Sequence, residues 1–123
     1  MAKFCYYNRN DDPTLHRNDC VTRAISLASG LPYSTIRRKL RNTARLLDCC
    51  RICMSCYSFF IEEVLLGKRI NCDNMTVEEF ADLHPKGTYL VRMQGHISVI
   101  IDNCVYDTFD CRKHLLTNCW EIR

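Results

Sequence analysis

The apolar residues of this chain recur with two different periods, and the change between the two falls near residue 87. Before that point they recur every three to four positions, as on one face of a helix, and after it they alternate, as in strands. Helices followed by hairpin-connected strands indicate an α+β fold, with N-terminal helices packed on one face of a C-terminal antiparallel sheet. At 123 residues, the chain is expected to form one domain that spans residues 1–123.

Two helices are expected in the first half of the chain. The first begins after Asp19 as N-cap and ends at Gly30, because its apolar residues share one helical face. The second begins after Ser34 as N-cap and has an apolar inner face. Residues 1–19 are polar and rich in turn formers, so we expect this segment to be irregular.

Two further helices and a set of strands complete the expected fold. A helix over residues 49–66, with a break near Ser55, ends before Gly67, and a shorter helix opens with a capping box formed by Thr76 and Glu79. The alternating segments that follow predict strands over residues 88–93, 96–102, 105–109 and 118–122.

Charge and hydropathy argue against nucleic acids and membranes as partners. The net charge is +3, and the excess lies on the outer face of the second expected helix, without the aromatic platform of a nucleic-acid binder. The longest nearly apolar run, residues 52–61, is about half the roughly 20 residues that a spanning helix needs. Residues 1–12 lack the apolar stretch of a signal peptide. We therefore expect a cytoplasmic protein whose 10 cysteines stay free thiols, with no membrane or nucleic-acid partner.

Three residues fit the requirements of thiol catalysis, which are a thiolate, a histidine within hydrogen-bond reach and a group that orients the imidazole. Cys20 opens the first expected helix, and a helix N-terminus lowers the pKa of a thiol. His96 begins an apolar strand after Gly95, and Asp107 lies in the next strand across a tight turn. Pairing of these two strands predicts that Asp107 lies near His96.

The same residues have structural interpretations that the spacing does not exclude. A cysteine after an aspartate is most often a small structural residue, and a histidine in a strand is most often on the surface or satisfied in the core. Asp107 would then be a turn residue that caps the hairpin. If a carboxylate orients His96, Asp110 is the alternative to Asp107.

Four segments carry a resemblance to a known family. They are residues 18–25 (NDCVTRAI), 87–91 (GTYLV), 95–100 (GHISVI) and 105–110 (VYDTFD). In this order they resemble small papain-like cysteine peptidases encoded by bacteriophages, relatives of the peptidase domains that process bacteriocin leaders. The resemblance covers nearly the whole chain apart from residues 45–57, approximately. It implies a papain-like fold and a cofactor-free thiol hydrolase in which Cys20 is the nucleophile, His96 the base and Asp107 the orienting group.

The chain departs from that family at the oxyanion site. Papain-like enzymes usually place a glutamine several residues before the cysteine, and no glutamine precedes Cys20, where residues 13–16 read PTLH. The backbone N–H of Cys20 can supply one donor to an oxyanion, and Asn10 or Asn18 is the candidate for the second, with Asn8 as a further alternative. Asn18 also stands where the family often has glycine.

A second group of cysteines raises the question of a metal. Cys49, Cys50, Cys53 and Cys56 contain two successive Cys-x-x-Cys spacings, and Cys72 could be a further ligand of zinc or of an iron–sulfur cluster. Cys49, Cys53 and Cys56 also share one face of the expected helix, where cysteines serve as small core residues. No histidine follows at zinc-finger spacing. We therefore expect no metal, with Cys49, Cys53, Cys56 and Cys72 as the alternative.

These features predict a cysteine hydrolase that cleaves a peptide or isopeptide bond of a peptide or protein substrate. If the chain is phage-encoded, it would act in the host cytoplasm. The same three residues could also support acyl transfer or glutamine deamidation, since amines and water both resolve a thioester. A catalytically idle papain-like fold that binds or inhibits a host protein is an alternative outside enzymology, and a zinc-held binding module over residues 49–72 is another. The sequence does not identify the substrate.

Overall fold

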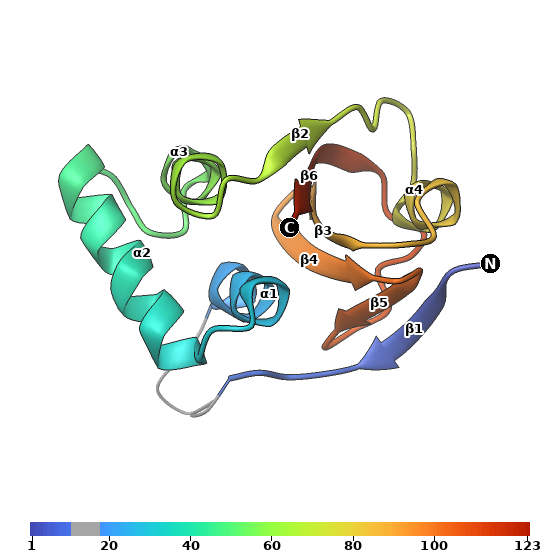
Figure 1. The fold of residues 1–123 in the computed structure, drawn as a ribbon, viewed down its shortest axis with the longest axis horizontal. Helices are drawn as coiled ribbons and strands as arrows, with labels where there is room; N and C mark the ends of the chain where they lie inside the picture. Colours follow the sequence, from blue (N-terminus) through green and yellow to red (C-terminus); the bar gives the residue numbers. More distant parts are fainter. Residues whose placement is uncertain (11–17) are drawn as a thin grey trace.

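The computed structural model describes residues 1–10 and 18–123. Its strands are β1 (Lys3–Tyr6), β2 (Lys68–Ile70), β3 (Thr88–Met93), β4 (His96–Ile101), β5 (Cys104–Asp107) and β6 (Leu116–Ile122). Its helices are α1 (Cys20–Ser29), α2 (Tyr33–Leu47), α3 (Met54–Phe59), a π-helical turn η1 (Phe60–Val64) and α4 (Val77–Leu83). The strands form one sheet in the order β1-β5-β4-β3-β6-β2, so the expected α+β class is confirmed (Figure 1).

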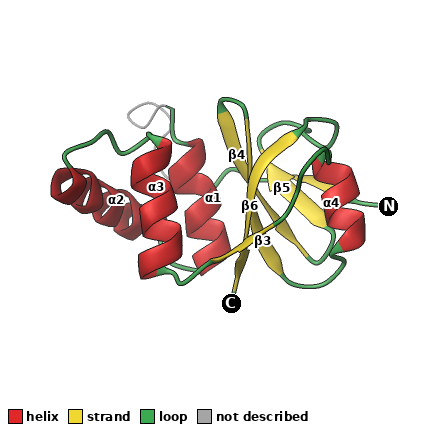
Figure 2. Cartoon of the chain, turned by 90° about the horizontal axis from the view of Figure 1, so that it is seen from above, coloured by secondary structure: helices red, strands yellow, loops and turns green. Residues whose placement is uncertain are grey.

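Helices lie on both faces of this sheet. Figure 2 shows α1, α2 and α3 on one side and α4 on the other. Because side chains alternate along a strand, Leu90 and Ile97 join the core beneath α1–α3, whereas Val91 and Ile100 join a second core around Phe80 of α4. The expectation that all helices share one face is therefore wrong for α4, whose apolar stripe packs on the opposite face.

The second helix begins two residues earlier than its local pattern indicates. Pro32 occupies the N-cap position and Tyr33 is the first helical residue, so Ser34 is not the N-cap. Tyr33 is buried and its hydroxyl donates to Asp19 at 2.9 Å, a contact made across the fold that local propensity does not reveal. The end of α1 is as expected, since Gly30 takes the left-handed conformation (φ 77°) there.

The helix expected from residue 49 begins only at Met54. Asp48 ends α2 in the left-handed conformation, and residues 49–53 form turns rather than the first part of a helix. The break thus lies before Met54 rather than near Ser55. Gly67 follows η1, where a Cβ atom would come within 2.8 Å of the Ile61 side chain, so close packing favours glycine there. The capping box of Thr76 and Glu79 at the start of α4 is confirmed.

The hairpin of β3 and β4 has the expected bounds to within one residue, and β5 and β6 begin one and two residues earlier than expected. Two edge strands were not expected. β2 pairs with β6, and β1, within the segment taken as irregular, pairs in parallel with β5 so that Tyr6 lies opposite Asp107. Both strands are short and largely exposed, so they lack an alternating apolar pattern.

Two further expectations concern membrane crossing and the turns before α1. Within the described residues, no helix combines the length and the apolar character that crossing a membrane requires. The turn signals expected among residues 11–17 lie outside the described residues.

Candidate active site

Cys20 is the first residue of α1, and within residues 1–10 and 18–123 no side-chain cap is formed at the N-terminus of this helix. The first helical hydrogen bond runs from the Arg23 N–H to the Asp19 carbonyl, so the N–H groups of Cys20, Val21 and Thr22 precede it. Asp19 holds the N-cap position as expected, but its side chain does not accept from these groups. The free N–H groups and the helix dipole therefore favour a negative charge at Cys20.

The Asp19 carboxylate does not cap α1 because other groups bind it. Its Oδ1 pairs with Arg23 one turn along the helix, and its Oδ2 accepts from the Tyr33 hydroxyl at 2.9 Å and from Asn10 Nδ2 at 2.5 Å. Asp19 is only 7% exposed, and a buried carboxylate needs such partners to offset its desolvation. The network fixes Asp19, the residue directly before Cys20.

His96 is brought to this helix end by the tight turn between β3 and β4. Gly95 takes a positive φ of 74° in that turn, and His96 is the first residue of β4. The ring Nε2 lies 2.6 Å from Asp107 Oδ2, and His96 lines the same pocket as Cys20 and lowers the pKa of its thiol. Because Nε2 faces Asp107, Nδ1 is the nitrogen left to face Cys20. The structure thus brings together the three residues that the sequence singled out.

The Asp107 carboxylate is 5% exposed and is held by several groups. They are the His96 ring, the Thr108 backbone N–H at 2.7 Å, the Cys111 thiol at 3.7 Å and the Arg23 guanidinium at 3.9 Å. Burial opposes ionisation, but the hydrogen bonds from His96 and Ser98 outweigh it and lower the pKa of Asp107. The alternative carboxylate, Asp110, is exposed and paired with Arg112 at 2.7 Å.

The pKa values of Cys20 and His96 move toward a thiolate–imidazolium pair. Burial disfavours the thiolate, but hydrogen bonds from His96 and from the Ile97 backbone N–H outweigh it and hold the pKa of Cys20 below its ordinary 9.0. Burial likewise disfavours the imidazolium, yet hydrogen bonds with Asp107 and Cys20 raise the pKa of His96 from 6.5 to about 9. The site therefore stabilises the charged forms of both groups.

A pocket of about 260 Å³ opens beside the thiol and the imidazole, and we call it the cleft. The residues that line it are Asn18, Cys20, Val21, Ile52, Met54, Tyr57, Arg92, Gly95, His96 and Ile97. They come from the start of α1, from α3 and the turn before it, and from the ends of β3 and β4. A cleft of this size accommodates about one or two side chains next to the reactive sulfur.

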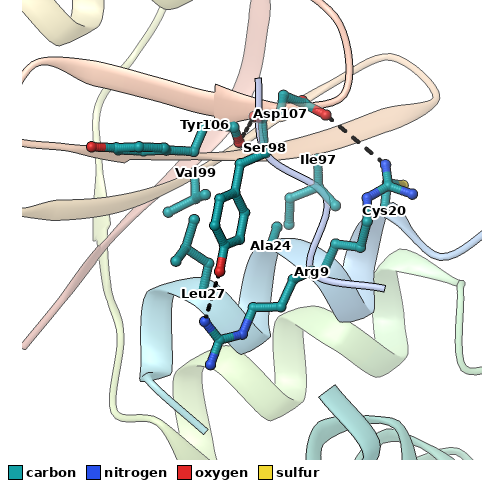
Figure 3. A pocket seen from close by; sticks show the side chains of 11 residues that line it. Arg9, Cys20, Ala24, Leu27, Ile97, Ser98, Val99, Tyr106 and Asp107 are labelled. Atoms are coloured by element: carbon teal, nitrogen blue, oxygen red, sulfur yellow. Dashed lines mark hydrogen bonds and ion pairs between the residues drawn. The ribbon is translucent and has the colours of Figure 1, made fainter. Parts of the chain in front are cut away.

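The other side of Cys20 is nearly closed. Figure 3 shows Ser98, Tyr106 and Asp107 on the sheet above α1, with Arg9 extended across the helix. Arg9 Nε donates to Ser26 Oγ at 2.6 Å, and the space that remains there is about 10 Å³, room for about one water molecule. A substrate therefore has access to the thiol from the cleft.

The structure places the candidate oxyanion residues as follows. The Asn10 amide donates to Asp19, and the Asn8 side-chain oxygen accepts from the Asn10 backbone N–H at 3.0 Å. Asn18 is exposed, lies at the rim of the cleft and takes a positive φ of 50°. Residues 13–16, the region in which papain-like enzymes usually carry the glutamine, lie outside the described residues. The uncapped N–H of Cys20 and the Asn18 side chain are thus the candidate donors that lie at the cleft.

The structure does not assemble the four cysteines proposed as alternative metal ligands. Cys56 is buried in the core beneath α1–α3 and its thiol donates to the Leu40 carbonyl at 3.6 Å, whereas Cys72 is buried in the core around α4. Cys53 is exposed at the N-cap of α3, so the single helical face expected for Cys49, Cys53 and Cys56 does not form. In the described part of the chain, no three His, Cys, Asp or Glu residues are placed to hold a metal ion.

Several residues of the site escaped the sequence reasoning. Arg23 links Asp19 to Asp107, Ser98 contacts Asp107, and Tyr57 and Arg92 line the cleft. The spacing of Asp19 and Arg23, four residues apart on a helix, could have indicated their ion pair. Nothing in the local sequence around Tyr57 or Arg92 reveals that they meet at the cleft.

The chemistry open to this arrangement is that of a nucleophilic thiolate. Its sulfur can attack an electrophilic carbon in the cleft, and the imidazolium beside it can then protonate a leaving group. Comparison with models of protein families, with curated proteins and with solved structures gives no match. The function therefore has to be inferred from the geometry and chemistry of the site.

Proposed function

We propose that this protein is a papain-like cysteine hydrolase that cleaves a peptide or isopeptide bond through a thioester intermediate. The observation that carries the proposal is the position of His96, which lines an open cleft together with Cys20 and whose ring hydrogen bonds with the Asp107 carboxylate. The order and roles of the three residues agree with the phage-encoded papain-like peptidases that the sequence resembles.

The reaction consists of acylation followed by hydrolysis. The Cys20 thiolate attacks the substrate carbonyl carbon, and the free N–H of Cys20 at the start of α1 donates to the developing oxyanion. The His96 imidazolium gives its proton to the leaving amine, which departs and leaves a thioester. His96, now neutral, takes a proton from water, whose oxygen attacks the thioester and releases the acid and the Cys20 thiolate.

Asp107 acts on the imidazole rather than on the substrate. Its carboxylate accepts from Nε2, which keeps Nδ1 directed at Cys20 and stabilises the imidazolium. Arg23 supports Asp107 from α1, so the nucleophile helix and the orienting group are tied together. Asp107 and Arg23 are therefore positioning residues.

The substrate in this proposal is a peptide or a protein, because the cleft is open to solvent and lies against a mixture of apolar and polar side chains. The thiolate must stay reduced for turnover, so the proposal places the protein in a reducing compartment, the cytoplasm, which would be the host's if the chain is phage-encoded. An amine in place of water would turn the same thioester into an acyl-transfer reaction, and a glutamine side chain in the cleft would make it a deamidation.

One observation favours the catalytically idle alternative, a papain-like fold that binds or inhibits a host protein. Of the asparagines considered as the second oxyanion donor, Asn10 donates its amide to Asp19, which leaves the exposed Asn18. Loss of one such donor costs roughly 10²–10³-fold in turnover in other acyl-transfer enzymes. A binding protein would tolerate that loss.

The experiment that tests the proposal is alkylation with limiting iodoacetamide at pH 6, with mass spectrometry of all ten cysteines. We expect Cys20 to react first, ahead of the more exposed Cys50, because only Cys20 has an imidazolium partner among the described residues. Incubation with a peptide library should then yield cleaved products that Cys20→Ala does not form. Preferential reaction of Cys50 or Cys53 would overturn the assignment of the nucleophile, and a reactive Cys20 without products would favour the idle fold.

A further inference from the structure

Arg92 lies in β3 and forms part of the wall of the cleft. Its backbone pairs with Ile97, the residue after His96, so its side chain faces the same side of the sheet as α1 and α3. The guanidinium is held in place: Nε donates to the Tyr57 hydroxyl at 2.6 Å and Nη1 donates to Thr117 Oγ1 at 2.8 Å. The guanidinium is thus pre-organised, and its orientation costs little when a ligand binds.

No acidic side chain of the described residues neutralises this charge. In residues 1–10 and 18–123, Arg92 forms no ion pair, and its Nη2 has no hydrogen-bond acceptor. None of the residues that line the cleft is Asp or Glu. Among the residues that line the cleft, the Cys20 thiolate and the His96 imidazolium carry opposite charges, and Arg92 adds a positive charge with no acidic residue beside it in the lining. A half-buried cation of this kind favours a carboxylate from the ligand.

Apolar side chains surround the rest of the cleft. Val21, Ile52 and Met54 line it together with the Tyr57 ring. Such walls suit the methylene groups of a side chain whose end reaches the guanidinium. The same cleft contains the Cys20 sulfur, so a carboxylate bound to Arg92 would belong to a residue near the scissile bond.

We propose that Arg92 is a specificity-determining residue that binds the carboxylate of a glutamate or aspartate side chain next to the scissile bond. This inference rests on the proposed hydrolase function and adds to it a substrate class, peptides with an acidic residue at the cleavage site. The alternative is a purely structural Arg92, which only ties β3 to Thr117 and to Tyr57.

Matched peptidyl vinyl sulfones test the proposal on the full chain. These probes carry Glu, Gln or Lys either beside the electrophile or one residue before it, and the thiolate adds to the alkene while a proton moves to the neighbouring carbon. We expect a Glu probe to label Cys20 about tenfold faster than its Gln twin, and the Lys probe to be slowest. Arg92→Gln should bring the Glu:Gln ratio close to one, and Arg92→Lys should keep part of it. Arg69→Gln, which removes an exposed arginine outside the cleft, should leave the ratio unchanged.

The ratio of two rates on one sample does not depend on the fraction of protein that is folded, so a destabilised Arg92 variant still gives an interpretable result. Equal rates for Glu and Gln probes in the wild type, or a ratio that Arg92→Gln does not change, would overturn this inference and leave the hydrolase proposal intact. Failure of Cys20 to react with any probe or with iodoacetamide would instead overturn the hydrolase proposal.

Discussion

The reactivity of Cys20 depends on where the proton between its sulfur and the His96 ring resides. Burial alone would hold the sulfur protonated, and the hydrogen bond from His96 is the largest of the contributions that reverse this effect. His96 in turn keeps its proton up to a pH of about 9 because Asp107 and Cys20 outweigh the effect of burial. Asp107 thus raises the pKa of His96, and His96 lowers the pKa of Cys20.

We therefore expect the alkylation rate of Cys20 to rise with pH through an inflection below 9.0, the ordinary pKa of a thiol. His96→Ala removes the hydrogen bond and the charge, so the inflection should move upward and the rate at pH 6 should fall about tenfold or more. His84→Ala is the matched control, since His84 lies on the other side of the sheet against Phe80. Iodoacetamide kinetics from pH 5 to pH 10 measure the position of the inflection and the rate at pH 6. An inflection that His96→Ala leaves in place would contradict the pairing.

Asp107 offers a second test at the scale of single residues. Asp107→Asn keeps an oxygen that can accept from Nε2 and should slow turnover mildly, whereas Asp107→Ala should slow it about 10²-fold or more. Asp110→Ala is the control, because Asp110 pairs with Arg112 rather than His96. Labelling rate and thermal midpoint are measured on the same variants. A lower midpoint with an unchanged Cys20 labelling rate would show that Asp107 only supports the hairpin.

Asp107→Ala should also change how the stability of the protein depends on pH. The pKa of His96 is higher in the folded protein, so its contribution to stability is full below about 6.5 and is lost as the pH rises through about 9. The pKa of Asp107 is lower in the folded protein, so its contribution is present above the ordinary value of 3.8 and is lost as the pH falls through the lowered value. The lowered pKa of Cys20 acts in the opposite direction, because its contribution to stability grows as the pH rises towards 9.0. Asp107→Ala removes the main group that raises the pKa of His96, so the thermal midpoint of this variant should fall less, or rise more, between pH 6.5 and pH 9 than that of the wild type.

At the scale of elements, local signals predicted most of the fold. Gly30 in the left-handed conformation and the capping box at Thr76 depend on neighbours in the sequence, and both are where the sequence indicated. The β3–β4 hairpin is also local, and its tight turn is what brings His96 toward the start of α1. The positions of Cys20, His96 and Asp107 were predictable because each sits at the end of an element with such signals.

The elements that escaped prediction depend on contacts across the fold. β1 exists because its backbone pairs with β5 about a hundred residues later in the chain, and its own side chains carry no alternating pattern. The start of α2 at Tyr33 depends on the distant contact with Asp19. Arg92 of β3 likewise contacts Tyr57 of α3, which is distant from it in the sequence. The specificity of the cleft therefore could not be derived from the sequence, although its reactive groups could.

At the scale of the whole molecule, the N-terminus of the chain reaches the site through β1. This strand pairs in parallel with β5, Tyr6 lies opposite Asp107, and the Tyr7 N–H donates to the Asp107 carbonyl at 2.9 Å. Arg112, from the loop after β5, donates to the Ala2 carbonyl at 2.9 Å and fixes the start of the strand. The backbone of the orienting residue is thus held by the first residues of the chain, and β4 pairs with the residue before it, Tyr106.

Deletion of residues 1–6 tests whether this strand supports the site. We expect the protein to fold, because the β3–β4 hairpin and both cores keep most of their members, but to lose roughly 2 kcal/mol of stability through Ala2 and the lost ladder. The edge of β5 would then be free, so Asp107 should orient His96 less well and Cys20 should alkylate more slowly at pH 6. Thermal unfolding and iodoacetamide labelling measure the two effects.

Three substitutions separate the backbone of β1 from its side chains. Lys3→Ala removes an exposed side chain and should change neither stability nor labelling. Tyr7→Pro removes the N–H that donates to the Asp107 carbonyl, whereas Tyr7→Phe keeps it and loses only the hydroxyl contact with Arg9. If β1 holds Asp107 through the backbone, Tyr7→Pro should slow the labelling of Cys20 and Tyr7→Phe should not. Equal labelling by both variants and by the deletion would show that β4 and the groups around the carboxylate hold Asp107 without help from the N-terminal strand.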